Sequence, residues 1–306
     1  MREPPVCAVI VTHHPTRSLE PLLMALRGQV ARVVIVDNGS TPENVAILKS
    51  LAATYPDFIE LILNGENIGL AAAQNQGIRA ALAAAHDWVL LLDDDSVPAP
   101  HMVQTMLATA QQPDQQIGIV APRMVEQNVA TQTQYLVSTG RWKLVRRKVS
   151  PGETLDNVAS VIASGSLIHR DVFARIGLMR EGLFIDYIDH DFCLRARAQG
   201  FAIRVVGDAE LQHRQGHKTA RQFLGRRIIT QNYSSIRRYY IFRNRMFFLR
   251  IHVRAAPIFL RHEALTCGWD IARILLLESE KWPKLCAAFK GIYHGIVRPI
   301  PPVVSV

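Results

Sequence analysis

Four apolar runs in the first third of the chain constrain its fold more than any other feature. They read CAVIVTHHP (7–15), VVIVDNGS (33–40), IELILN (59–64) and WVLLL (88–92), and helix-like spacings of apolar residues separate them at 18–26, 43–55 and 67–86. Strands that are apolar along their whole length are buried on both faces, and their alternation with helices is typical of parallel βαβ units. The pattern predicts a doubly wound, mostly parallel α/β sheet.

The polar ends of these runs indicate where a ligand binds. THHP, DNGS and DDDS each follow an apolar run directly. In open parallel sheets, ligands bind in a crevice at the carboxyl ends of the strands. We therefore expect the three clusters to share one crevice.

The three successive aspartates of LLDDDSV (91–97) favour a hard divalent cation, Mg²⁺ or Mn²⁺, because these ions prefer oxygen ligands and bridge to phosphates. Neighbouring side chains of an extended segment point to opposite sides. Asp93 and Asp95 should therefore share one side, with Asp94 on the other. A solvated acidic turn is the alternative, with Asp95 or Ser96 capping a helix from Pro98 to Ala110.

The rest of the chain continues the α/β pattern and then becomes helical and basic. We expect a strand at 117–122, a variable excursion at 126–158, a strand and helix at 161–179, an amphipathic helix within 183–200, a strand from 201, and basic helices beyond about residue 219.

The stretch LFIDYIDHDFCLRARAQG (183–200) contains the candidate general base. Asp191 and Arg195 are four residues apart, which is the spacing of a helical ion pair. Asp189 lacks such a partner, because Cys193 occupies that offset, and its neighbours are apolar. A half-buried carboxylate at a helix start suits a general base, so Asp189 is the first candidate, with Asp186 and Asp191 as alternatives.

Two histidines follow the next extended stretch. His213 ends it, and His217 lies four residues later. Imidazole is a ligand for Mn²⁺ and comparable metals, although a single histidine is more often a surface or core residue. Gly216 between the two argues against the helix of a zinc protease.

The charge of the chain is unevenly distributed. Residues 201–306 contain 18 Lys and Arg against 6 Asp and Glu, whereas residues 1–200 contain 17 against 20. A basic C-terminal third favours an anionic partner such as a membrane surface, phosphates or nucleic acid. We find no signal peptide and no apolar run that reaches the roughly 18 residues of a spanning helix. Four cysteines without CxxC spacing suit a reducing cytosol.

Seven motifs taken together in order resemble the inverting nucleotide-sugar glycosyltransferases of family 2, which have the GT-A fold. They are CAVIVTHHP, VVIVDNGS, NIGLAAAQNQGI, LLDDDS, VIASGSLI, LFIDYIDHDFCLRARAQG and RRYYIFRNR, and they cover roughly residues 6–250. Within the family, the set is most similar to bacterial rhamnosyltransferases that use dTDP-L-rhamnose to build cell-surface polysaccharide.

This resemblance implies roles for individual residues. Thr12, Asp37, Asn67 and Gly69 would hold the base and ribose, and Asp93 and Asp95 would be the DxD pair, with Asp93 towards the ribose and Asp95 on a metal. His213 would complete the metal site, and Asp189 would be the catalytic base. Asp94 departs from the pattern, which usually has a non-acidic residue there, and Ile188 replaces a usual glutamate. The acceptor or diphosphate side would involve Gly165, Ser166, Asp191, Arg195, Arg243 and Asn244.

The resemblance also implies a division of the chain. Residues 1–218 would form the GT-A catalytic domain, with a nucleotide-binding part at about 6–122 and an acceptor and base part at about 123–218. Residues 219–306 would form a basic helical appendage.

The implied function is metal-dependent transfer of L-rhamnose from dTDP-L-rhamnose to a glycan or polyprenyl-diphosphate-linked acceptor. Transfer from UDP-galactofuranose or from a UDP- or GDP-hexose is the alternative. A sugar nucleotidyltransferase or a dehydrogenase would open with a glycine-rich phosphate loop, which THHPTRS does not provide. A non-catalytic binding module would leave the acidic strand ends unexplained.

The basic C-terminal third leaves several partners open. Its helices could simply pack their aromatic residues on the sheet, with solvated arginines. Alternatively, they could form a dimer surface, or a peripheral surface on the inner face of the cytoplasmic membrane, where basic and aromatic side chains act together. We expect a cytoplasmic enzyme with no nucleic-acid partner.

Overall fold

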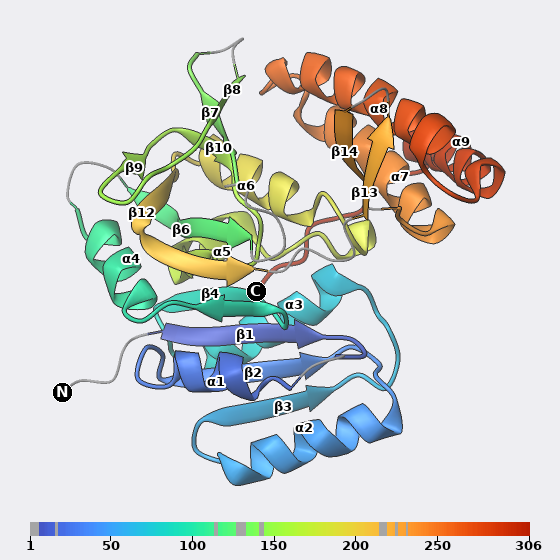
Figure 1. Ribbon diagram of the computed structural model, residues 1–306. Coiled ribbons are helices and arrows are strands. Elements are labelled where there is room, and N and C mark those ends of the chain that lie inside the picture. The colour runs from blue at the N-terminus through green and yellow to red at the C-terminus, as the bar shows by residue number, and fades with distance from the viewer. Residues whose placement is uncertain are drawn as a thin grey trace.

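The computed structural model of the chain (Figure 1) describes residues 6–15, 18–112, 116–126, 133–140, 144–213, 219–223, 226–230 and 232–306. Its centre is a nine-stranded sheet in the order β3-β2-β1-β4-β11-β6-β12-β5, with β9 pairing β12. These strands are β1 (Val6–Thr12), β2 (Arg32–Asp37), β3 (Ile59–Leu63), β4 (Trp88–Asp93), β5 (Ser96–Pro98), β6 (Ile117–Glu126), β9 (Thr154–Leu155), β11 (Leu167–His169) and β12 (Ala202–His213).

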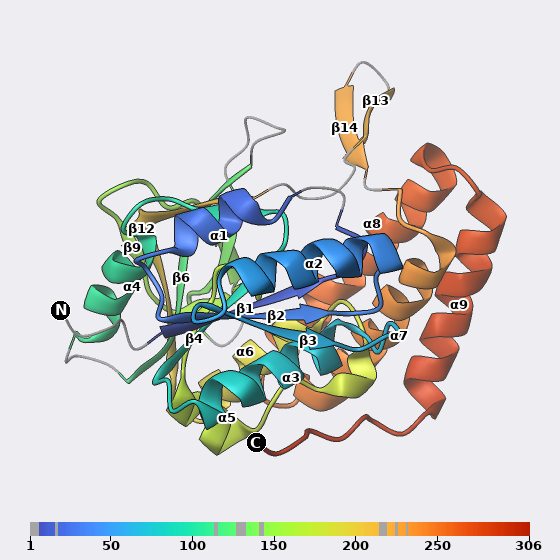
Figure 2. The same ribbon diagram turned by 90° about the horizontal axis from the view of Figure 1, so that it is seen from below.

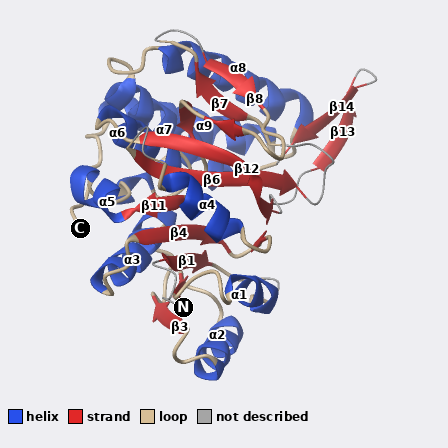
Figure 3. Ribbon diagram, turned by 90° about the vertical axis from the view of Figure 1, so that its left-hand side faces the viewer, coloured by secondary structure: helices blue, strands red, loops and turns tan. Residues whose placement is uncertain are grey.

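Helices cover both faces of this sheet. They are α1 (Glu20–Leu26), α2 (Pro42–Thr54), α3 (Leu70–Ala83), α4 (Met102–Ala110), α5 (Arg170–Ile176), the 3-10 helix η1 (Glu181–Leu183) and α6 (Ile188–Ala198). Helices α1 and α2 lie on one side of the parallel strands, and α3 lies on the other (Figure 3).

The four apolar runs form the parallel half of the sheet. Strand β1 pairs in parallel with β2 and β4, and β2 pairs in parallel with β3. Beyond β4 the sheet is mixed, because β11 runs antiparallel to β4 and β6 while β12 is parallel to β6. Strands β1, β2 and β4 are buried on both faces, as continuous β-branched and leucine runs require, whereas the edge strand β3 is mostly half-buried. The predicted α/β class with a mostly parallel sheet is confirmed.

The segment after the three aspartates differs from our expectation. Residues 96–98 form strand β5, which pairs antiparallel with the end of β12, and α4 begins only at Met102. His101 occupies the N-cap position with a left-handed φ of 63°. Ser96 therefore belongs to the sheet and does not cap the helix, which corrects one of the two alternatives for DDDS.

The excursion at 126–158 contains a small antiparallel sheet in the order β10-β7-β8, formed by β7 (Tyr135–Ser138), β8 (Leu144–Arg147) and β10 (Val158–Ser160). The Tyr135 hydroxyl connects this sheet to β6. It donates to the Pro122 carbonyl at 2.8 Å and accepts from the Met124 N–H at 2.9 Å.

The chain beyond residue 219 begins with a hairpin instead of the helix that we expected. Strands β13 (Thr219–Phe223) and β14 (Arg226–Thr230) pair antiparallel and project from the body (Figure 2). The β-branched run of Ile228, Ile229 and Thr230 favours a strand there in spite of the flanking charges.

Three helices follow the hairpin: α7 (Ser235–His252), α8 (Ile258–Leu277) and α9 (Lys281–Val297). Helices α7 and α9 pack closely through two glycines. A Cβ at Gly291 would lie 2.5 Å from the Tyr239 carbonyl oxygen, and a Cβ at Gly295 would lie 2.5 Å from that of Arg243. No helix in the described part of the chain is both long and apolar enough to cross a membrane.

A buried polar network joins α7 and α8 to the start of α6. Arg245 of α7 donates to the Tyr187 hydroxyl at 2.9 Å, to Glu263 at 3.1 Å and to Asp270 at 2.7 Å. The Tyr187 hydroxyl in turn donates to Glu263 at 2.5 Å. Nearer the start of α7, Arg238 pairs with Glu278 at the end of α8, so charged side chains also join these two helices to each other.

The C-terminal segment returns to the body after α9. It passes below the sheet towards α5 (Figure 2), where the Leu178 N–H donates to the Val304 carbonyl at 2.8 Å and Arg180 donates to the Pro301 carbonyl. Residues 299–306 therefore connect the helices to the loop after α5.

Candidate active site

The carboxyl ends of β1, β2 and β4 form one edge, as the sequence predicts. In the sheet register, Thr12 lies beside Asp37, and Val11 lies beside Asp93. The backbone N–H of His14 donates to the Ser40 hydroxyl at 2.8 Å, which joins the loops after β1 and β2. THHP, DNGS and DDDS thus lie together at this edge, where we expected a shared crevice.

Asp93, Asp95 and His213 converge at this edge. One potential ligand atom from each lies within 4.8 Å of the other two. Asp93 ends β4, and His213 ends β12 opposite Ser96 of β5. His213 Nδ1 lies 3.2 Å from Asp95 Oδ1 and 2.8 Å from the Ser96 hydroxyl. The pairing of β5 with β12 is what brings the histidine to the aspartates.

The electrostatics of this cluster favour a bound cation. Burial raises the pKa of Asp93 to about 6, opposed by His213 and reinforced by the charges of Asp95, Asp94 and Asp189. Asp95 Oδ1 is buried, and its described polar contact is the approach of His213 Nδ1 at 3.2 Å. Two carboxylates and an imidazole are a donor set that suits Mg²⁺ or Mn²⁺. The residues present therefore fit a divalent cation.

Asp94 points away from this cluster. Its Oδ2 accepts a 2.8 Å hydrogen bond from the Thr12 hydroxyl. Burial raises the pKa of Asp94, while the Thr12 hydrogen bond lowers it. The alternation expected for an extended DDD segment is present, and it places Asp94 beside β1 instead of beside the cation site.

Asp37 has a buried oxygen available for a ligand. Its side chain is fully buried at the end of β2; Oδ2 accepts from the Ser40 N–H at 3.1 Å, whereas Oδ1 has no hydrogen-bond partner among the described residues. A buried carboxylate oxygen without a donor is costly, so a ligand N–H would stabilise it.

Asn67 and Gly69 shape the loop before α3. The Asn67 side-chain oxygen accepts from the Gly69 N–H at 3.0 Å and from the Asn38 amide at 3.1 Å. Gly69 has φ 93°, and a Cβ there would lie 2.5 Å from the Phe184 ring. Asn38 also holds this loop, because its side-chain oxygen accepts from the Ile68 N–H at 3.0 Å, and we did not single it out from the sequence.

Asp189 lies in the first turn of α6, after an unusual loop. Phe184, Asp186 and Tyr187 all have φ between 64° and 67°, a conformation that L residues seldom adopt and that clusters at functional sites. Asp189 is half-buried, and its Oδ1 accepts from the His190 N–H at 2.9 Å. Its charge contributes to the raised pKa of Asp93, behind burial, which places both carboxylates near one crevice.

The alternative bases are both engaged in ion pairs. Asp186 receives two 3.0 Å hydrogen bonds from Arg237 of α7. Asp191 is buried against Arg180, against Arg195 at 2.9 Å and against the His252 imidazole at 2.9 Å. Although burial opposes it, these partners lower the pKa of Asp191 to about 2. Among the described residues Asp189 forms no ion pair, and its carboxylate is half-buried.

Four residues that the resemblance assigned to the acceptor or diphosphate side make hydrogen bonds to or from the backbone. Arg243 and Asn244 donate to the carbonyls of the loop that precedes Asp189, including Leu183 at 2.8 Å from Asn244. The Gly165 N–H donates to the Leu91 carbonyl at 2.7 Å, and the Ser166 hydroxyl donates to the Ile162 carbonyl. Their geometry favours shaping of the site over ligand contact, as it does for Asp191 and Arg195.

Two serines contribute to the site: Ser164, which we did not single out from the sequence, and Ser96, which we considered only as a helix cap. The Ser164 hydroxyl accepts from the Asp93 N–H at 3.0 Å and lies 2.8 Å from the Ser96 hydroxyl, which contacts His213. These contacts join residues that are 68 and 117 positions apart. The spacing of residues within a short stretch of sequence cannot predict contacts between such distant residues. His217 lies outside the described residues.

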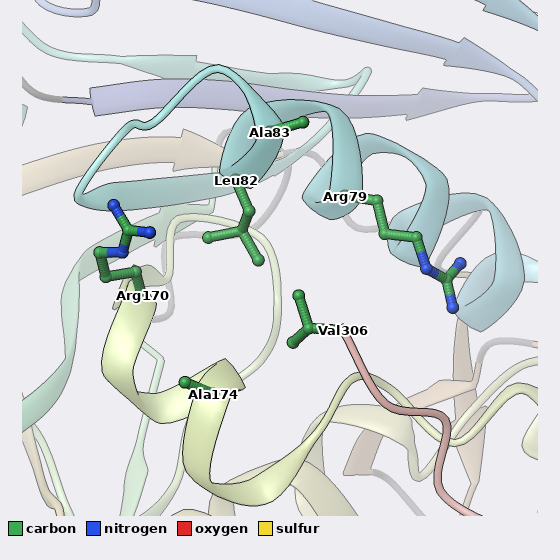
Figure 4. Close-up of a pocket in the computed structure, with 6 residues that line it drawn as sticks. All are labelled: Arg79, Leu82, Ala83, Arg170, Ala174 and Val306. Carbon is green, nitrogen blue, oxygen red and sulfur yellow. The ribbon is translucent and has the colours of Figure 1, made fainter.

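The pocket in Figure 4 lies away from this crevice. Arg79, Leu82 and Ala83 of α3 line it together with Arg170, Ala174 and Val306. His169 pairs with Trp88 at the amino end of β4, so Arg170 lies a strand length from Asp93. The candidate active site is therefore the acidic cluster, and this pocket is separate from it.

Comparison with known proteins agrees with this geometry. The sequence profile of Glycosyl transferase family 2 matches residues 7–177. The dTDP-rhamnosyl transferase RfbF of Shigella flexneri is 30% identical over 248 residues, which cover 80% of each chain. The galactofuranosyltransferase GlfT1 of Mycolicibacterium smegmatis is 26% identical over 294 residues, covering 92% of this chain and 94% of that protein.

Solved glycosyltransferase structures share the fold. Residues 1–349 of Staphylococcus aureus TarS superpose with a TM-score of 0.58 at 16% identity, covering 95% of this chain and 81% of that one. The mannosyltransferase PcManGT of Pyrobaculum calidifontis, solved with GDP-Man and Mn²⁺, gives 0.57 at 14% identity and covers 96% and 88%. GalNAc-T7, solved with UDP, GalNAc and Mn²⁺, gives 0.60 at 15% identity and covers 81% and 48%.

Proposed function

Because the chain belongs to glycosyl transferase family 2, we propose that it transfers L-rhamnose from dTDP-L-rhamnose with inversion, in a reaction that depends on a divalent cation. The observation that carries this proposal is the convergence of Asp93, Asp95 and His213 at the sheet edge, with Asp189 close by. Likeness to the rhamnosyl transferase of Shigella flexneri supports the choice of donor.

The chain's residues divide the work between donor and acceptor. Asp37, through its unpartnered Oδ1, would accept a hydrogen bond from the nucleotide base, with Thr12 and the Asn67–Gly69 loop beside the base and ribose. Asp93 would lie towards the ribose, and Asp95 and His213 would hold the cation, which neutralises charge on the leaving diphosphate. Asp94 would hold Thr12 in place.

Asp189 would act as the general base. With Oδ1 bonded to its own helix, Oδ2 is left to accept the proton of the attacking acceptor hydroxyl. The new bond forms between that oxygen and the sugar C1 as the bond from C1 to the diphosphate breaks on the opposite face. Because base and leaving group lie on opposite faces, one carboxylate suffices and the product is inverted.

A donor screen tests this proposal. The purified protein would be titrated by calorimetry with dTDP-L-rhamnose, UDP-galactofuranose, UDP-hexoses and GDP-mannose, with and without Mn²⁺. We expect dTDP-L-rhamnose to bind most tightly, in the presence of the metal. Asp37→Asn should weaken the binding of every nucleotide sugar in the screen. Tighter binding of a UDP- or GDP-sugar would overturn the donor assignment and leave the family intact.

Galactofuranosyl transfer is the second candidate. The galactofuranosyltransferase of Mycolicibacterium smegmatis aligns over more of this chain than the rhamnosyl transferase does, at lower identity. The same screen separates the two donors, since they differ in both nucleotide and sugar. For either donor, we propose a glycan or polyprenyl-diphosphate-linked acceptor that is reached from the cytoplasm, in the synthesis of cell-surface polysaccharide.

A further inference from the structure

Helices α8 and α9 each leave an apolar face uncovered. The exposed side chains on α8 are Leu260, Leu265, Trp269, Leu275 and Leu276, and those on α9 are Trp282, Phe289, Tyr293, Ile296 and Val297. Each of these ten side chains is between 46% and 75% exposed. The outer face of a helix on a water-soluble domain is normally polar, and groups of exposed apolar residues mark interaction sites.

The exposed side chains on α9 follow helical spacing. Trp282, Cys286, Phe289, Tyr293 and Ile296 are separated by four and three residues in turn, so they lie along one side of the helix. The opposite side, with Ala288, Gly291 and Gly295, is buried against α7. We call the exposed sides of α8 and α9 the outer faces.

The acidic residues of this region are mostly turned inward. Residues 232–306 contain twelve Lys and Arg but only four Asp and Glu. Three of these acids, Glu263, Asp270 and Glu278, are buried in ion pairs with Arg245, Arg238 and Lys284. Only Glu280 is exposed. The cations that remain exposed are Arg250, Arg254, Arg261, Lys281, Lys290 and Arg298. The internal ion pairs therefore leave a strongly basic surface around the apolar outer faces.

Strand β8 adds further positive charge beside α8. Arg146 and Arg147 are exposed, and Leu144 packs in the same apolar cluster as Phe259 of α8. The pKa of His262 on α8 is lowered by burial and, in part, by the nearby positive charge of Arg146. The two arginines of β8 thus lie next to the helical surface.

We propose that the outer faces of α8 and α9 bind the surface of an anionic lipid bilayer. Exposed Trp and Tyr side chains suit the boundary between head groups and acyl chains, and the cations around them match anionic head groups. A second copy of the chain fits less well, since a twofold contact would bring two copies of the same basic surface together.

This surface extends the proposed function without depending on the donor. A bilayer contact through α8 and α9 would bring the enzyme to a lipid-linked acceptor. Binding to vesicles is measured without any sugar nucleotide, so its failure and the failure of the rhamnosyl assignment are separate results.

Vesicle co-sedimentation tests the proposal. The full chain would be mixed with vesicles of phosphatidylcholine alone, or with phosphatidylglycerol added, at low and high salt. We expect pelleting with the anionic vesicles that weakens as salt is raised, because salt screens exposed charges. Each cation near such a surface strengthens binding about fivefold, so Lys281→Glu/Lys290→Glu should weaken it about 30-fold or more.

A matched variant separates the surface from general charge. Lys49→Glu/Arg170→Glu makes the same change in net charge at exposed positions on α2 and α5, and its binding should stay within about threefold of wild type. Trp282→Ser removes a 75% exposed side chain and should weaken binding while the circular dichroism spectrum stays unchanged.

A fluorescent probe at Cys286 reports how deeply α9 enters the bilayer. Cys286 is exposed, Cys267 is half-buried, and Cys7 and Cys193 are buried. In a Cys267→Ser variant, a thiol-reactive fluorophore should therefore label Cys286. We expect a blue shift of the fluorescence with anionic vesicles and quenching by brominated lipid.

No pelleting with anionic vesicles at low salt, or an equal loss of vesicle binding in the matched variant, would overturn the proposal. Dimerisation abolished by Trp282→Ser, without vesicle binding, would assign the faces to a second copy.

Discussion

Replacing Arg245 with methionine should destabilise the whole protein. Arg245 is 2% exposed and donates to Tyr187, Glu263 and Asp270. Methionine has a similar length but no charge, so two buried carboxylates would lose a principal partner. Removing one member of a buried ion pair costs about 3–5 kcal/mol. Asp270 keeps Arg238 at 3.7 Å. We therefore expect a loss near the lower end of that range.

Urea unfolding followed by circular dichroism measures this loss. Wild type, Arg245→Met, Glu263→Gln and the double variant would be compared at pH 7. The double variant should be less destabilised than the sum of the single changes, because glutamine leaves no unpaired charge, and the coupling should fall between about 0.5 and 3 kcal/mol. Arg79→Met is the control, since its 3.8 Å pair with Glu181 is exposed and should contribute at most about 1 kcal/mol.

The same variant should also slow catalysis. Tyr187 precedes Asp189 by two residues in a left-handed conformation, and Arg245 is one of its hydrogen-bond donors. We expect kcat to fall under conditions in which the variant is fully folded. A destabilisation no greater than that of Arg79→Met, with unchanged kcat, would refute this reasoning.

Four further predictions follow from the site. Asp189→Asn should lower kcat by roughly 10²–10⁴ with little change in donor affinity, and retained turnover would exclude Asp189 as the base. Asp95→Ala should abolish the Mn²⁺ dependence of donor binding, measured by calorimetry. Gly69→Ala should cost about 1–3 kcal/mol in urea unfolding, because its φ is 93° and the new Cβ would meet the Phe184 ring. The pKa of Asp191 is about 2, below its usual 3.8. Its ionisation therefore contributes about 2 kcal/mol to the free energy of unfolding above pH 4, and this contribution is lost as the pH falls towards 2. Asp191→Asn should flatten that part of the profile of stability against pH.

The parallel half of the fold was readable from the sequence because its signals are local. Continuous apolar runs specify buried strands, and a polar residue that follows such a run must lie at the sheet edge. Asp93, Asp94 and Asp95 alternate as an extended segment requires, and Asp189 falls at a helix start as its apolar neighbours indicate.

The other parts depend on contacts between distant segments. Whether Ser96 caps a helix or pairs with His213 is decided by β12, more than a hundred residues away. The family resemblance of RRYYIFRNR assigned Arg243 and Asn244 to the acceptor or diphosphate side. Their partners are carbonyls of residues 182–186, and only the tertiary structure shows that these groups need donors. The hairpin of β13 and β14 was not predicted because its arginines interrupt the short β-branched pattern of its strands.

The buried network and the returning C-terminal segment have a consequence for how this chain can be recombined with its relatives. Tyr187 contacts Glu263 and Arg245, while Leu178 and Arg180 contact residues 301–304. A chimera that joined the sheet of one family member to the helices of another would mismatch both sets of contacts. The helices and the loop around the base should therefore be inherited as one unit, even though more than forty residues separate them along the chain.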